Sequence, residues 1–174
     1  MLQNYNKYAL LKVFFVSPTE SFRLRELARL SGISPPSVMN YLSQFLKEGL
    51  IEKYQKRGVP FYRSQRENEK FILYKKIALI FELNDCGLVS YLWEKLSPEA
   101  IVLFGSAARG ESIESSDIDI CIVGREARVN INKYEKSLNS SVHLIFEQDS
   151  RIVSPEFKNN LANGIVLKGY LRLL

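Results

Sequence analysis

The sequence predicts an α+β chain built from two parts of different character. Residues 1–66 show three helical stretches and then two short strands, whereas residues 98–174 alternate short apolar strands with helices. Charge divides at a similar place, since residues 1–76 hold 14 Lys or Arg against 6 Asp or Glu and residues 77–174 hold 10 against 13. We therefore expect a basic helical module, connecting helices at residues 67–97, and an α/β module with a small mixed sheet.

Three helices are predicted in the basic module. Residues 5–16 carry apolar side chains at helical spacing, residues 24–30 form a second short helix, and Ser34 with Pro35 begins a third. Gly49 is placed to end the third helix. The apolar periodicity of that helix predicts four buried positions, namely Val38, Leu42, Phe45 and Leu46.

A hairpin is predicted after the third helix, because two short strands flank the basic turn Lys56-Arg57-Gly58-Val59-Pro60. The helices before it contain recurring residues at fixed spacing: Leu24-x-x-Leu27-Ala28, Gly32-Ile33-Ser34, Ser37-Val38-x-x-Tyr41-Leu42-x-x-Phe45 and Gly49-Leu50-Ile51. This pattern, over about residues 5–66, resembles a winged helix-turn-helix domain.

The resemblance implies that the third helix enters the major groove of DNA. The side chains of that helix that periodicity leaves outside the core would then face the DNA: Ser34, Ser37, Asn40, Tyr41 and Gln44. Asn and Gln can read adenine, and Ser and Tyr commonly contact phosphate. Lys56 and Arg57 are placed for phosphate or minor-groove contacts. A domain used for protein contacts or dimerisation is the alternative, because a fold does not dictate its function.

Helices and strands are also predicted beyond the basic module. Residues 71–83 show an apolar stripe made of Phe71, Tyr74, Ile77, Ala78 and Phe81, and this helix and the next are expected to join the two parts and offer a face for dimerisation. The remaining predicted elements are a helix at 88–96, strands at 100–104, 118–123 and 141–146, a short helix from Ser106 or Ala107, and a helix at 155–162.

A Gly-Ser turn and two carboxylates lie at the ends of two of these strands. Ten residues separate Gly105-Ser106 from Asp117, and Asp119 follows two positions after Asp117. Alternate strand residues share a face, so the two carboxylates are expected about 7 Å apart and directed to one side. Such oxygen ligands suit Mg²⁺, and a glycine lets backbone N–H groups approach a phosphate closely.

Gly-Ser-x-x-x-Arg-Gly followed by Ser-Asp-x-Asp is similar to the signature of the polymerase beta nucleotidyltransferase superfamily, in particular its minimal, MNT-type branch, from about Pro98 onward. The resemblance implies Mg²⁺, with Mn²⁺ as an alternative, and a nucleoside triphosphate such as ATP as substrate or ligand. It implies in-line transfer of NMP to a hydroxyl with release of pyrophosphate. It assigns the metal to Asp117 and Asp119 and the nucleotide to Gly105, Ser106, Arg109 and Ser116, although a surface role for Arg109 is an equal alternative.

The predicted fold class is thus α+β, an N-terminal winged helix-turn-helix domain plus a C-terminal nucleotidyltransferase-like α/β domain with a small mixed sheet. The third strand departs from the superfamily pattern, because His143, the single histidine, stands where the third carboxylate usually lies. An imidazole is a poor Mg²⁺ ligand, but it can accept a proton or bind Mn²⁺ or Zn²⁺. Glu147 is a possible substitute for that carboxylate, but it lies four residues on and is expected past the end of the strand. Two functions stay open: a nucleotidyltransferase, with His143 as a catalytic residue, or a DNA-binding regulator whose transferase domain senses nucleotide or mediates assembly.

The expected partners are DNA, a nucleotide, a protein acceptor such as a toxin partner, which the MNT-type resemblance implies, and a second copy of the chain. No apolar run of 18 residues occurs, and the N-terminus lacks the layout of a signal peptide, so no membrane association is expected. Cys86 and Cys121 give no metal or disulfide framework, which favours a cytoplasmic location, and Cys121 is expected to be buried in its strand.

Overall fold

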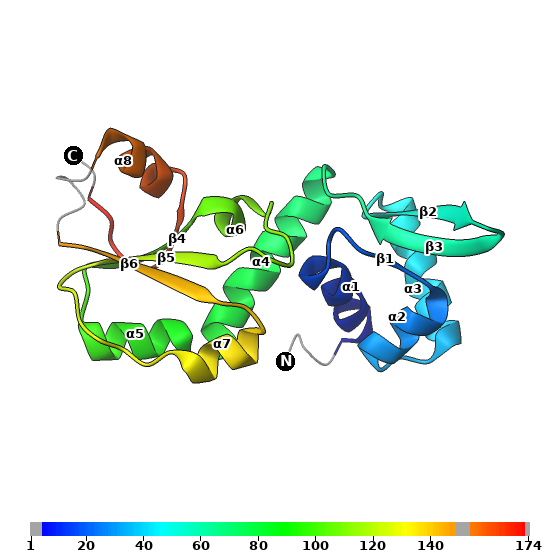
Figure 1. Cartoon of the computed structure of the whole chain (residues 1–174), viewed down its shortest axis with the longest axis horizontal. Coiled ribbons are helices and arrows are strands. Elements are labelled where there is room, and N and C mark those ends of the chain that lie inside the picture. The colour runs from blue at the N-terminus through cyan, green and yellow to red at the C-terminus, as the bar shows by residue number, and fades with distance from the viewer. Residues whose placement is uncertain (1–4, 149–153, 173–174) are drawn as a thin grey trace. The chain divides into compact units, whose positions relative to one another are not determined.

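A computed structural model describes residues 5–148 and 154–172, and the chain divides into two compact units at Lys75 (Figure 1). Each unit has its own sheet, three-stranded with the order β1-β3-β2 in the first unit and four-stranded with the order β6-β5-β4-β7 in the second. The predicted α+β fold class is confirmed. Among the described residues, no helix combines the length and the apolar character that crossing a membrane requires.

Three helices and an antiparallel hairpin make up the N-terminal unit, with a two-residue strand added at the edge. The elements are α1 (Asn6–Val16), β1 (Ser21–Phe22), α2 (Leu24–Ser31), α3 (Pro35–Lys47), β2 (Ile51–Lys56) and β3 (Val59–Ser64). Strand β1 pairs with β3 and was not expected, because two residues are too few to show a periodic pattern. The predicted order of three helices and a hairpin is otherwise confirmed.

The core of this unit lies among the three helices and β3. Phe14 of α1 is fully buried and packs edge-to-face on Phe22, with ring centroids 5.6 Å apart. Ser64 is buried on β3 and donates its hydroxyl proton to the Phe14 carbonyl over 3.2 Å, which ties the hairpin to α1. Three predicted core residues of α3, Val38, Leu42 and Phe45, are buried with exposed fractions of at most 1%, whereas Leu46 is half-buried.

The hairpin turn is tighter than the sequence suggested. Lys56 pairs with Val59, so only Arg57 and Gly58 form the turn, and both have positive φ, 53° and 76°. Two left-handed residues are the geometry of the turn that best matches the twist of a two-stranded ribbon. Tyr54 and Phe61 stack across the strands with centroids 5.8 Å apart. The wing formed by β2, the turn and β3 is therefore held by side-chain packing as well as by its strand pairing.

The second unit surrounds a mixed sheet with helices. Strand β4 pairs antiparallel with β5 and β7, and β5 pairs parallel with β6. The predicted small mixed sheet is confirmed. The elements that follow the hairpin are α4 (Glu69–Asp85), which crosses the unit boundary, α5 (Leu88–Leu96), β4 (Ala100–Phe104), α6 (Gly105–Arg109), β5 (Ile118–Val123), α7 (Asn132–Leu138), β6 (Val142–Glu147), α8 (Pro155–Ala162) and β7 (Ile165–Gly169).

Both faces of the central strands are covered by helices. Leu103 and Ile120 belong to a core cluster with Leu92 of α5, and Val102 and Cys121 belong to another with Leu161 of α8. Burial on both faces is why β4 and β5 read as continuous apolar runs in the sequence rather than as alternating patterns. Helix α5, predicted as a connecting helix, packs within the core of this unit, and α4 contains the division at Lys75.

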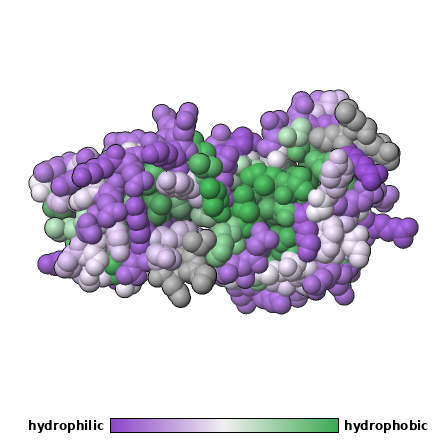
Figure 2. Space-filling view, turned by 180° about the vertical axis from the view of Figure 1, so that it is seen from behind, coloured by the Kyte–Doolittle hydropathy of each residue, from purple (hydrophilic) through white to green (hydrophobic). Residues whose placement is uncertain are grey.

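Helix α4 buries a different face from the predicted stripe. Phe71 and Ala78 are buried as expected, but Tyr74 and Ile77 are 37% and 52% exposed. Leu73, in the same turns, is 48% exposed. Hydrophobic side chains gather over this part of the molecule in Figure 2. The apolar residues of α4 outnumber those its buried face accommodates, so apolar spacing alone did not define that face.

The two cysteines differ in accessibility, which yields a first prediction. Burial raises the pKa of the Cys121 thiol to about 12, and burial also raises the pKa of the half-buried Cys86 thiol. Because the thiolate is the reactive form, we expect an alkylating reagent at about pH 8 to modify Cys86 slowly and Cys121 only after denaturation. Peptide mass spectrometry with and without urea measures this, and rapid labelling of Cys121 in the folded chain would contradict its burial.

Candidate functional site

The sheet of the second unit brings three of the predicted site residues to one edge. Phe104 pairs with Asp119, and Asp119 pairs with His143 on the next strand. Gly105 follows Phe104 directly, at the end of β4. Because β5 is antiparallel to β4 and parallel to β6, the end of β4 and the starts of β5 and β6 meet at this edge. The topology therefore gathers Gly105, Asp119 and His143 from positions far apart in the sequence.

Gly105 lies directly against the Asp119 carboxylate. Its φ is +70°, and a Cβ atom added there would stand 2.6 Å from Oδ2 of Asp119. Such a distance is far inside van der Waals contact, so any side chain at position 105 would displace the carboxylate. A bare backbone beside a carboxylate can be approached by a phosphate on one side and a cation on the other.

His143 contacts the other oxygen of the same carboxylate. Its Nδ1 lies 3.3 Å from Oδ1 of Asp119, and the two side chains are 61% and 29% exposed. A carboxylate oxygen only accepts hydrogen bonds, so the imidazole donates from Nδ1 in this contact. Asp119 is thus held between the Gly105 backbone and an exposed imidazole, and part of its side chain stays accessible to solvent.

Asp117 lies exposed immediately before β5. Within residues 5–148 and 154–172, no three His, Cys, Asp or Glu side chains are grouped closely enough to hold a metal ion. Asp117, Asp119 and His143 therefore do not form a three-ligand centre, and the predicted metal pair of Asp117 and Asp119 stays a prediction. Two carboxylates at this edge still fit Mg²⁺, which is commonly held by one or two carboxylates and completes its shell with phosphate oxygens and water.

Glu147 does not supply the carboxylate that the third predicted strand lacks at position 143. The expectation that Glu147 lies past the end of that strand is wrong. It is the last residue of β6 and pairs with Val123, so it lies within the strand rather than past its end. The pairing places it at the opposite end of the strand from His143, about 13 Å away along the chain. There its charge contributes to the raised pKa of Cys121.

The remaining predicted nucleotide contacts surround α6. Ser106 is half-buried in this helix, and Ser116 accepts a hydrogen bond from the backbone N–H of Ile113 over 2.9 Å, so that its hydroxyl shapes the loop before β5. Arg109 is exposed, and its Nε donates to Glu111 over 2.7 Å. Exposed ion pairs of this kind are weak, so Glu111 is no strong competitor to a phosphate for the Arg109 guanidinium.

The outward face of α3 differs in part from the predicted one. Ser34 and Asn40 are exposed, whereas Ser37, Tyr41 and Gln44 are half-buried. Exposed residues of α3 that were not predicted on this face include Met39, which is 57% exposed, and Ser43. Met39 follows buried Val38 by one position and precedes buried Leu42 by three, and residues three apart share a helix face, so helical spacing gave no signal of its exposure. Its apolar side chain was a reason to expect it in the core.

Comparison with protein families agrees with the two units. Residues 9–54 match the family model of the IclR helix-turn-helix domain, and residues 86–167 match that of the nucleotidyltransferase domain. The chain joins a helix-turn-helix domain to a nucleotidyltransferase domain. No curated protein matches the chain. The matched part of the nucleotidyltransferase domain includes α5 and all the predicted metal and nucleotide residues.

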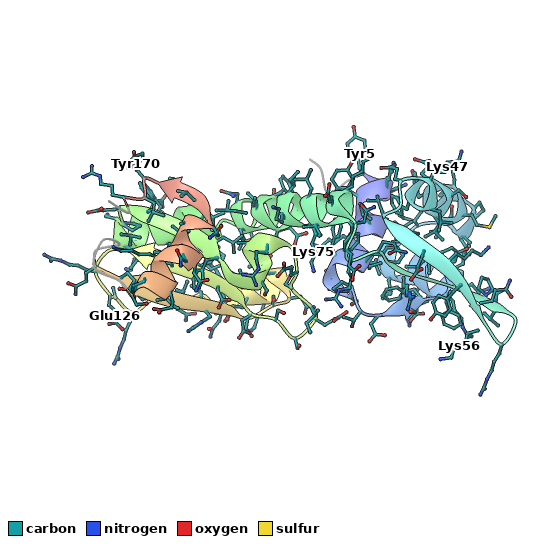
Figure 3. The ribbon with its side chains drawn as sticks, turned by 90° about the horizontal axis from the view of Figure 1, so that it is seen from above. Tyr5, Lys47, Lys56, Lys75, Glu126 and Tyr170 are labelled. Carbon is teal, nitrogen blue, oxygen red and sulfur yellow. The ribbon has the colours of Figure 1, made fainter. Side chains whose placement is uncertain are left out.

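The helix-turn-helix domain carries cations at both ends of its candidate DNA-binding surface. Lys47 stands at the end of α3, and Lys56 stands beside the wing turn (Figure 3). Arg57 belongs to the same turn, and all three side chains are exposed. Ser34 is at the N-terminal cap position of α3, but its hydroxyl donates to Ser37 Oγ over 3.0 Å instead of capping the helix.

Proposed function

We propose that this chain is a DNA-binding protein whose nucleotidyltransferase domain binds a nucleoside triphosphate with Mg²⁺ and transfers NMP to a hydroxyl of a protein or small molecule. The observation that carries the proposal is the contact between the Gly105 backbone and the Asp119 carboxylate at the paired ends of β4 and β5. It supports a phosphate and a cation bound next to each other, as nucleotide transfer requires.

Each residue at this edge has a distinct task in the proposal. Bound Mg²⁺, or Mn²⁺, would neutralise phosphate charge and stabilise the attacking and leaving oxygens. Asp117 and Asp119 supply oxygen ligands, and Gly105 and Ser106 hold the outer phosphates through backbone N–H groups and a hydroxyl. Arg109 offsets negative charge at the phosphates. His143, hydrogen-bonded to Asp119, accepts the proton of the attacking hydroxyl.

Transfer can be measured with ATP labelled at the α-phosphate. The chain is incubated with this ATP and with Mg²⁺ or Mn²⁺, alone and with candidate acceptors, and label on an acceptor is quantified. Label that appears only with the divalent cation and is lost in Asp117→Asn supports the proposal. Nucleotide that binds but leaves no label on any acceptor tested contradicts transfer and favours the second function below.

The second candidate is a DNA-binding regulator that binds nucleotide without turnover. The observation that favours it is His143, which occupies the strand position beside Asp119 and leaves the site without a third carboxylate. Nucleotide would then be a ligand that changes DNA affinity. Titration of DNA with and without Mg²⁺–ATP distinguishes a sensor, whose DNA affinity shifts, from an enzyme whose DNA affinity is independent of nucleotide.

A homodimer is a further prediction, for which exposed apolar side chains of α4 offer a surface.

Loss of the wing cations is expected to weaken DNA binding uniformly across sequences. If Lys56 and Arg57 each contact a phosphate, the variant K56A/R57A should reduce the slope of log affinity against log salt by about 2. Fluorescence anisotropy with labelled duplexes at several salt concentrations measures the slope.

A matched control for the wing variant is Arg66→Ala. Arg66 is an exposed cation beyond the end of β3 that lies opposite the wing turn, so its removal changes the charge of the domain without touching the wing. If the effect were general electrostatics, each cation removed would reduce the slope alike, so a reduction of about 1 in R66A would contradict a specific contact by the wing.

A further inference from the structure

The exposed face of α3 is uncharged over most of its length. Residues 36, 39, 40, 43 and 47 follow helical spacing on the side away from buried Val38, Leu42 and Phe45. Between Ile33 and Leu46 the sequence contains no Lys or Arg. The commonest base-specific contact in the major groove is Arg or Lys to guanine. The middle of this helix therefore lacks the usual means of reading a G·C pair.

Two serines on this face, one at the cap position and one within the helix, donate their hydroxyl protons to neighbouring groups of the same segment. Ser34 donates to Ser37 Oγ over 3.0 Å, and Ser43 donates to the carbonyl of Met39 over 3.0 Å. Two exposed side chains remain at the centre of the face, Met39 and Asn40. One presents a flexible apolar thioether and the other an amide with both donor and acceptor groups.

These two side chains match the two halves of an A·T pair. The C5-methyl of thymine is the apolar group that the major groove presents, and adenine presents an N6–H donor and an N7 acceptor that pair with the carbonyl and the NH₂ group of one Asn. We propose that Met39 packs on a thymine methyl and Asn40 reads a neighbouring adenine, so that the recognised site has A·T pairs opposite the centre of α3. The inference rests on the proposed DNA-binding function.

Charge around the face fits the same occupant. Lys47 lies at the C-terminal end of α3, and Lys56 and Arg57 lie at the wing turn, so cations flank an uncharged centre. Phosphates border the major groove on both sides, whereas its floor displays the base edges. This complementarity favours duplex DNA over an acidic protein surface, because an acidic surface offers no matching partner for an uncharged centre that carries a methionine.

The test removes a single methyl group from the DNA. Duplexes bound by the full chain are first enriched from a randomised pool, and each thymine of the enriched site is then replaced by uracil, which lacks the C5-methyl. At one position we expect wild-type affinity to fall about fourfold, the effect of one buried methyl group. The variant Met39→Ala should bind the thymine and uracil duplexes equally, and circular dichroism checks that this exposed substitution leaves the fold intact.

Lys47→Ala is the control, since loss of a phosphate contact should weaken both duplexes alike and keep the fourfold ratio. Sequence-selective binding with no uracil effect at any position, or the same effect in Met39→Ala, overturns the inference and leaves DNA binding standing. Enrichment of G·C pairs opposite the centre of α3 also overturns it. Failure of the wild-type chain to bind any duplex overturns the DNA-binding function and the inference together.

Discussion

Asn in place of Asp119 is expected to abolish NMP transfer while the nucleotidyltransferase domain stays folded. The carboxylate lies between the Gly105 backbone and His143, and its side chain is 29% exposed, so an amide of nearly the same shape fits the space. The substitution removes the negative charge that would hold a cation at the phosphates. We expect transfer to fall by at least about 100-fold, the scale on which transition-state electrostatics act.

The rate of label transfer from α-labelled ATP measures this effect, and the thermal unfolding midpoint checks the fold. Glu126→Gln is the matched control, because Glu126 is an exposed carboxylate of the same unit, on the loop after β5 (Figure 3). Equal losses in both variants, or an Asp119→Asn chain that transfers label at the wild-type rate, would contradict the role assigned to Asp119.

Gly105→Ala is expected to destabilise the nucleotidyltransferase domain and to prevent nucleotide binding. The left-handed φ of +70° costs an L-residue about 1–2 kcal/mol, and the new methyl would stand 2.6 Å from Oδ2 of Asp119. Relief of that contact must move the carboxylate, so two residues of the site change together. Isothermal titration with Mg²⁺–ATP measures the affinity, and denaturant unfolding measures the stability.

Gly32→Ala separates the cost of conformation from the cost of contact. Gly32 has the same φ of +70°, but a Cβ there meets no atom within 4 Å. This control should destabilise the helix-turn-helix domain by the conformational cost alone, and it should bind nucleotide as the wild type does. A Gly105→Ala variant that binds Mg²⁺–ATP with unchanged affinity would show that the phosphate does not approach position 105.

The elements that the sequence predicted best are those whose burial is complete or periodic. Strands β4 and β5 are buried on both faces, so their apolar runs were plain, and α3 keeps its core residues at helical spacing. Helix α7 was missed because Tyr134 is its one buried residue, and β7 because it lies at the edge of its sheet and no residue of it is fully buried. Both depend on tertiary contacts that a local pattern does not contain.

The meeting of two strands at the candidate site was predictable from the sequence, but the side-chain contacts there were not. The spacing of Gly105 and Asp119 predicted that a strand end and a strand start meet. The contact between Asp119 and His143 depends on the parallel register of β5 and β6, which are joined by a long connection, and no local signal encodes that register. Met39 was hidden for another reason, since an apolar residue next to a core position is expected inside.

The most direct test of the nucleotide–metal site uses the single histidine of the chain. The Hε1 proton of His143 gives one signal in the proton NMR spectrum, and a paramagnetic Mn²⁺ bound at Asp119 would lie close enough to broaden it. We predict that added Mn²⁺–ATP broadens this signal in the wild-type chain, that Mg²⁺–ATP does not, and that Asp119→Asn abolishes the broadening. A His143 signal that stays sharp in excess Mn²⁺–ATP would contradict a nucleotide–metal site at this edge of the sheet.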